Sequence, residues 1–151
     1  MAASRRRGSP QPRRDGRARL AAAAQRVLAW EGARAAHVEL TLLDVPAMRR
    51  LNRRVTGRRS LTDVLAFALP QPDGALLGDV YICPMAAERW VMTGGQREGE
   101  SGGVEEELIR LAVHGTLHVL GYDHPEGPGR ARSPMWRRQE RYVRRLVSAG
   151  R

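Results

Sequence analysis

Hydrophobic side chains recur along this chain with two different spacings, one typical of helices and one of strands. In five segments they stand three or four positions apart, which places them on one face of a helix. End signals support these segments, since Asp44 and Pro46 suit the cap and first turn of a helix and Gly32 suits the end of one. The predicted helices cover residues 17–32, 44–55, 84–93, 104–120 and 135–147.

Three other segments are predicted to be strands, at residues 37–43, 62–69 and 76–82. The first alternates apolar and polar residues, as half-buried strands do, and the other two are short, mostly apolar runs. The Pro-Gln-Pro-Asp-Gly sequence at 70–74 is typical of a tight turn, so the second and third segments are predicted to form a hairpin. We therefore expect an α/β fold, α+β-like, in which a small mixed sheet of about four strands packs with about five helices.

The length of 151 residues and the 42% hydrophobic content suit one compact domain, expected over 17–151. Residues 1–16 mix arginine with glycine, serine and proline and offer little to bury, so we expect a disordered basic arm there. An arginine-rich, acid-poor leader is also typical of an organellar transit peptide. Of the two, we favour a basic arm of a bacterial protein over a transit peptide.

The chain is strongly basic, with 26 Lys+Arg against 16 Asp+Glu and a net charge of +10. Every basic residue is arginine, and the excess lies in residues 1–19 and 130–151. Guanidinium groups pair with phosphate oxygens, so an anionic polymer such as RNA is one expected partner. A role in solubility explains the same charge equally well.

Two classes of protein are excluded by the remaining composition. No apolar run approaches the roughly 18 residues that a membrane-spanning helix needs, so no membrane association is expected. The only cysteine, Cys83, excludes an internal disulfide framework and favours a reducing compartment, which we take to be the cytoplasm.

Candidate chemistry is concentrated in HGTLHVLGYDH, which holds three of the four histidines. His114 and His118 are four positions apart on a predicted helix, so both imidazoles project from one face, with Cβ atoms about 5–6 Å apart. Gly121 is expected to reverse the chain and bring His124 close to them. Three imidazoles match a catalytic zinc site with an open fourth position, so we predict one Zn²⁺ per chain at the end of this helix. His37, alone at a strand start, is assigned no role.

Other polar residues near this motif have simpler explanations. Glu105, Glu106 and Glu107 complement the dipole at the start of the 104–120 helix and need no catalytic role. Asp123 either orients a ligand imidazole or caps the turn. The motif also has the spacing of metzincin proteases, which carry a glutamate general base after the first histidine. Gly115 holds that position here, so peptide hydrolysis lacks its usual base.

The motif HGTLHVLGYDH resembles the signature of the YbeY family, bacterial metal-dependent endoribonucleases that take part in ribosomal RNA maturation and ribosome quality control. The resemblance spans about residues 38–146 and includes Leu51-Asn52, the LTDVLAF sequence at 61–67, the LGDV sequence at 77–80, Ile82, Met135 and Glu140. It implies an α/β fold, a single zinc bound by His114, His118 and His124, and cleavage of single-stranded RNA, including processing of the 16S 3′ end. Ribosomal RNA, the ribosome and a ribosomal protein or GTPase are the partners it implies.

The chain departs from the family pattern in the segment before the second strand. Thr56 stands where many members have an arginine thought to help catalysis, and Arg59 stands where an aspartate commonly follows. The proline usual before Thr-Asp is Leu61. We expect Arg58 or Arg59 to reach the same phosphate from a neighbouring position.

Two other functions stay open at this stage. One is a metallohydrolase acting on peptides or small molecules, which the metzincin-like spacing favours and Gly115 weakens. The other is a ribosome-assembly factor that has a structural zinc and binds RNA through its basic tails. For a ribonuclease, attack by water and attack by the RNA 2′-hydroxyl are both open. A role in the turn is favoured for Thr62, and a structural pairing is slightly favoured for Asp79.

Overall fold

The computed structural model describes residues 14–95 and 102–150. Residues 1–13 of the predicted arm lie outside these ranges. In chain order the elements are α1 (Arg14–Trp30), β1 (Ala36–Leu42), α2 (Val45–Thr56), β2 (Val64–Pro70), β3 (Leu76–Ile82), α3 (Pro84–Met92), α4 (Val104–Val119), the short 3₁₀ helix η1 (Arg130–Arg132) and α5 (Pro134–Ala149). Helix α1 begins at Arg14 rather than at residue 17, so residues 14–16 of the predicted arm are helical; they add no apolar residue to the periodic pattern that predicted the helix.

The sheet confirms the predicted strands and their mixed arrangement. Its order is β1-β3-β2, with β1 parallel and β2 antiparallel to β3. The hairpin turn carries Gly74 with a positive φ of 87°, a conformation that glycine adopts without strain. The described residues form three strands rather than the expected four or so, and these correspond to the three strand segments identified in the sequence.

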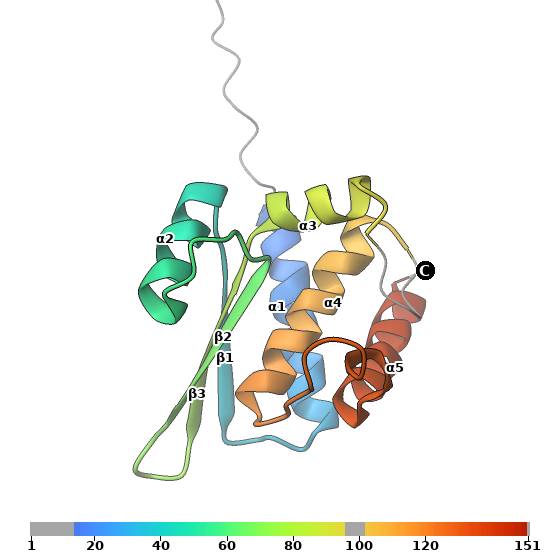
Figure 1. Cartoon of the computed structure of the whole chain (residues 1–151). Helices are drawn as coiled ribbons and strands as arrows, with labels where there is room; N and C mark the ends of the chain where they lie inside the picture. Colours follow the sequence, from blue (N-terminus) through green and yellow to red (C-terminus); the bar gives the residue numbers. More distant parts are fainter. Residues whose placement is uncertain (1–13, 96–101, 151) are drawn as a thin grey trace, which may run out of the picture.

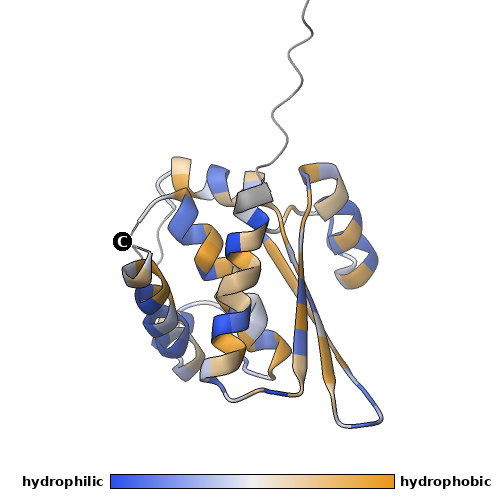
Figure 2. Cartoon of the chain, turned by 180° about the vertical axis from the view of Figure 1, so that it is seen from behind, coloured by the Kyte–Doolittle hydropathy of each residue, from blue (hydrophilic) through white to orange (hydrophobic). Residues whose placement is uncertain are grey.

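Helices α1 and α4 pack on one face of the sheet, and α5 packs against α4 on the side away from the sheet (Figure 1). Helices α2 and α3 lie at the end of the sheet opposite the hairpin turn. One core cluster fills the space between the sheet and α1 and α4, and a second joins α1, α4 and α5. Helix α5 is predominantly hydrophilic in Figure 2, with Met135, Tyr142 and Val143 buried toward the second cluster.

Two glycines let α4 lie unusually close to the central strand. A Cβ atom at Gly78 would lie 2.4 Å from Val119 Cγ1, and one at Gly115 would lie 2.6 Å from Val80 Cγ1. Real Cβ atoms do not approach other heavy atoms so closely, so both positions require glycine for packing. Helix α4 therefore approaches β3 closely at Gly78, and Gly115 faces the sheet.

No helix within the described ranges is both long and apolar enough to cross a bilayer.

Candidate metal centre

The last two turns of α4 hold the first two histidines of the motif. His114 is buried, with 6% of its surface exposed, and His118 is half-buried. Their rings are nearly perpendicular, with centroids 4.5 Å apart, and their Nε2 atoms are 3.0 Å apart. The four-residue spacing therefore places both imidazoles on one face of the helix, as predicted.

A glycine turn after α4 brings the third histidine to the same point. Gly121 has a φ of 98°, and its N–H donates to the carbonyl of His118 at 3.0 Å. The chain reverses there, and His124 Nε2 comes to lie 3.3 Å from His118 Nε2. One nitrogen from each of the three rings lies within 4.8 Å of the others. The predicted convergence of His114, His118 and His124 is confirmed.

Hydrogen bonds on the far side of each ring select one tautomer. The Nδ1–H of His118 donates to the carbonyl of Tyr122 at 3.0 Å, and that of His124 donates to the carbonyl of Pro125 at 3.1 Å. Carbonyl oxygens only accept, so in both rings Nδ1 carries the proton and Nε2 presents a lone pair. Bonds of this kind orient the histidine ligands of metal sites.

The tautomer of His114 is set by a side chain from α5. His114 Nδ1 lies 2.6 Å from Gln139 Oε1, and Gln139 Nε2 donates to Glu140 Oε2 at 3.0 Å. The second bond fixes the orientation of the Gln139 amide, so its oxygen accepts from His114 Nδ1–H. The Nε2 lone pair of His114 therefore also points toward the Nε2 atoms of His118 and His124.

Three lone pairs that face one another repel unless a cation lies between them. A tetrahedral zinc with Zn–N bonds of about 2.0–2.1 Å would hold its nitrogens about 3.3 Å apart, close to the observed 3.0 and 3.3 Å. Burial, and then the neighbouring His118, lower the pKa of His114 to about 3. Burial, and then the charge of His124, also lower the pKa of His118. Both rings are neutral at pH 7, the form that binds metals, so the three histidines could hold a metal ion.

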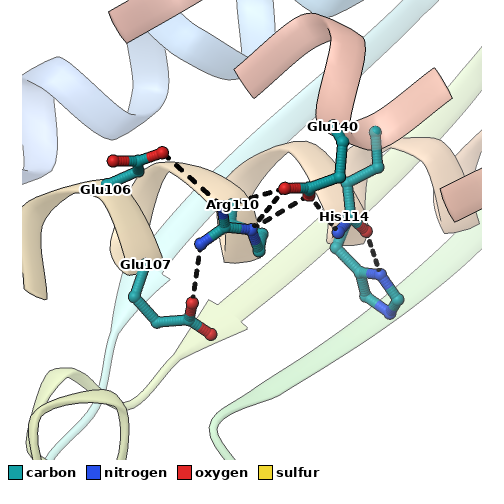
Figure 3. A network of polar contacts seen from close by, with 6 residues as sticks. Glu106, Glu107, Arg110, His114 and Glu140 are labelled. Carbon is teal, nitrogen blue, oxygen red and sulfur yellow. Dashed lines mark hydrogen bonds and ion pairs between the residues drawn. The ribbon is translucent and has the colours of Figure 1, made fainter. Parts of the chain in front are cut away.

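A buried ion-pair network lies next to His114, around Arg110 (Figure 3). Arg110, one helical turn earlier on α4, donates three hydrogen bonds of 2.9–3.1 Å to Glu140 on α5 and one of 2.9 Å to Glu107. Glu106 Oε1 lies 3.6 Å from Arg110 Nη2. Glu140 also accepts from Gln139, so the network continues to the metal centre.

The loop that carries His124 is tied to α1 by a carboxylate. Glu31 accepts hydrogen bonds of 3.1 Å from the hydroxyls of both Tyr122 and Tyr142, and Arg138 Nη1 lies 3.2 Å from Glu31 Oε1. Tyr122 is the residue whose carbonyl holds His118. The end of α1 and helix α5 therefore fix the turn between the second and third histidines.

Other residues singled out in the sequence lie outside this cluster. Arg58 and Arg59 are exposed in the loop between α2 and β2, and within the described ranges no hydrogen bond or ion pair joins either side chain to a histidine. Asp123 accepts from the backbone N–H of His124 at 2.8 Å, which is a turn-capping contact. The Thr62 hydroxyl donates to the carbonyl of Val64 at 3.4 Å.

The residues that support the site were not predicted from the sequence. Glu107 was expected only to complement the helix dipole, whereas it is buried and paired with Arg110. No role was predicted for Gln139. The available signal was Arg110 itself, a charged residue in an otherwise apolar stretch of α4, four positions before His114 and so on the same helix face.

A mixed sheet covered by two helices, with three convergent histidines at the end of one of them, defines a small α/β protein with a candidate metal centre. The chain belongs to the YbeY family, since the family model described as Endoribonuclease YbeY matches residues 12–147. This result agrees with the resemblance noted in the sequence.

Individual relatives and one solved structure support this membership. The Endoribonuclease YbeY of Pelotomaculum thermopropionicum is 40% identical over 133 residues, which cover 82% of this chain and 81% of that protein. That of Thermotoga petrophila is 34% identical over 107 residues, covering 71% of this chain and 65% of that protein. The chain thus spans about two thirds of the length of that relative. The solution structure of a Thermotoga maritima protein superimposes with a TM-score of 0.61 at 25% identity, covering 93% of this chain and 87% of that one.

Proposed function

We propose that this protein is a zinc-dependent endoribonuclease specific for single-stranded RNA, acting in the cytoplasm in ribosomal RNA maturation, including the 16S 3′ end, and in ribosome quality control. The observation that carries the proposal is the convergence of three Nε2 lone pairs, each fixed by a carbonyl acceptor at Nδ1. The relatives named Endoribonuclease YbeY support the choice of RNA. The ribosome, with a ribosomal protein or GTPase, remains the partner implied by the family.

His114, His118 and His124 would hold one zinc ion per chain. Two of them are half-buried, so the centre opens to solvent on the His124 side and leaves room for substrate. When bound, zinc would polarise a phosphoryl oxygen and lower the pKa of a water molecule. The protein's part is to keep the three rings neutral and correctly oriented, through Gln139 and the carbonyl of Tyr122 among others.

Arg58 and Arg59 are proposed to bind the RNA phosphate in place of the family arginine. Their loop is held at both ends: Asn52 Nδ2 donates to the carbonyl of Ser60 at 2.8 Å, and the Thr56 hydroxyl donates to the carbonyl of Asn52 at 2.7 Å. Both guanidinium groups are exposed and therefore extend from an anchored backbone. If an Arg58→Ala, Arg59→Ala variant cleaves RNA as well as the wild type does, this role is refuted.

The competing peptide-hydrolase function is weakened by the packing of Gly115. The first atom of any side chain there would be directed at Val80 in the sheet. A glutamate could not be added at this position without displacing the strand, so the metzincin general base has no equivalent place.

The test is cleavage of single-stranded ribosomal RNA by purified protein, with duplex RNA as the substrate control and zinc content measured on each sample. A His114→Ala, His118→Ala variant should lose zinc and cleavage together. The matched control is His37→Ala, because His37 is exposed on β1 and is not one of the three clustered histidines. Zinc-loaded wild type that binds RNA but leaves it intact would overturn the proposal in favour of an assembly factor. The product ends decide the nucleophile, since a 2′,3′-cyclic phosphate requires attack by the 2′-hydroxyl.

A further inference from the structure

A group of arginines is stacked on aromatic rings where α1 and α5 meet. The rings of Trp30 and Tyr142 lie 5.1 Å apart, centroid to centroid. Arg145 lies over Trp30 at 4.3 Å and Arg26 at 5.5 Å, while Arg141 lies over Tyr142 at 6.0 Å. All three arginines are exposed. We call these five residues the arginine–aromatic face.

Within the described part of the chain, the arginines of this face are not neutralised by ion pairs, and the neighbouring carboxylate of Glu31, which accepts from Tyr142, is paired with Arg138. Among residues 14–95 and 102–150, no ion pair involves Arg26, Arg141 or Arg145. Helix α5 has five arginines and a single acidic residue, Glu140, which is buried against Arg110. Arg141 and Arg145 are also four positions apart, an arrangement in which like charges destabilise a helix. The face therefore favours an anionic ligand that relieves this repulsion.

We propose that the arginine–aromatic face is a second RNA-binding surface, separate from the histidine centre, which binds the phosphodiester backbone of a long substrate. Guanidinium groups pair with phosphate oxygens through two parallel hydrogen bonds. Stacking on Trp30 and Tyr142 restrains these side chains before the ligand arrives, which reduces the entropy lost on binding. This inference depends on the proposed function only in taking RNA as the substrate.

This surface is joined to the histidine centre by a short chain of contacts. Tyr142 and Tyr122 both donate to Glu31, and the carbonyl of Tyr122 accepts from His118. RNA bound on the arginine–aromatic face would consequently be held in a fixed orientation relative to the centre. The two surfaces would together select RNA that extends beyond the cleavage point.

The positive charge of the arginine–aromatic face would also suit an anionic membrane. The distribution of apolar side chains argues against this ligand. Helices that lie on membranes place large exposed apolar residues beside their basic ones. The exposed large hydrophobic residues of the described part of the chain belong to α2, α3 and the β2–β3 hairpin. Helix α5 contributes none of them.

The test compares an Arg141→Gln, Arg145→Gln variant with a control, Arg49→Gln, Arg50→Gln, which removes the same charge from the exposed surface of α2. Binding of a single-stranded RNA of about 30 nucleotides is measured by fluorescence anisotropy over a range of salt, with intact RNA verified on gels. Each phosphate contact in single strands contributes about 0.7 to the slope of log K against log salt, so the α5 variant should lose about 1.4. The control should keep the wild-type slope.

Equal losses in the two variants would overturn the proposal, because net charge alone would then explain the binding. An unchanged slope in the α5 variant would also overturn it. So would an α5 variant that loses affinity only for vesicles containing phosphatidylglycerol, which would assign the face to membranes. Failure of wild type to cleave RNA would refute the proposed nuclease function instead, and the binding comparison would still decide the role of this face.

Discussion

Arg110 offers the most decisive test of how the centre is supported. Its side chain is 4% exposed and donates four hydrogen bonds to Glu107 and Glu140. Replacing it by methionine keeps most of the apolar stem but leaves two buried carboxylates without their counter-charge. Removing one partner of a buried ion pair costs about 3–5 kcal/mol. We expect Arg110→Met to lower the free energy of unfolding by this amount and the Tm by on the order of 10 °C.

The measurement is urea unfolding followed by tryptophan fluorescence, with zinc affinity determined on the same samples. Arg19→Met is the matched control, since Arg19 lies 3.6 Å from Glu105 in a pair whose side chains are 58% and 85% exposed. Such exposed pairs contribute about 0–1 kcal/mol. Adding Glu107→Gln and Glu140→Gln to Arg110→Met should restore much of the lost stability, because the uncompensated charges disappear. An Arg110→Met protein as stable as the Arg19→Met control would refute the reasoning.

Three further predictions concern the centre and its packing. Gln139→Met should weaken zinc binding about 10–100-fold in a chelator competition, because His114 loses the acceptor that fixes its tautomer; unchanged affinity would show that another group orients the ring. Gly115→Ala should destabilise the protein by about 1–2 kcal/mol in urea unfolding, because a clash with Val80 costs more than the roughly 1 kcal/mol of helix propensity gained. A more stable variant would mean that the strand moves aside. Removal of metal by a chelator should abolish RNA cleavage and leave the far-ultraviolet circular dichroism unchanged, since neither core cluster includes any of the three histidines. Unfolding on chelation would favour a structural zinc.

Local patterns in the sequence account for the elements and for the histidine cluster. The strand β3 and the start of α4 agree with their predicted limits, and Gly121 reverses the chain as expected. These features depend on neighbours within a few positions, where side-chain spacing and turn chemistry act directly. The convergence of three histidines was predictable because one helix and one turn determine it.

The support of the cluster depends on tertiary packing, which no local pattern encodes. Gln139 reaches His114 across 25 positions, and Glu140 reaches Arg110 across 30. Both contacts follow from how α5 packs on α4. A sequence shows that Arg110 interrupts an apolar helix, but the identity of its partner depends on the docked position of another helix. The functions of Arg58 and Arg59 remain predictions for the same reason.

The contact between Gln139 and His114 also sets an order for the appearance of the finished centre. During translation all three histidines are added to the chain before Gln139 and Glu140. A nascent chain that has reached His124 lacks both the acceptor for His114 and the main counter-charge for Arg110. The supported centre exists only after α5 has been made and has docked. A protein proposed to cut RNA would thus lack its supported catalytic site until α5 has packed against α4.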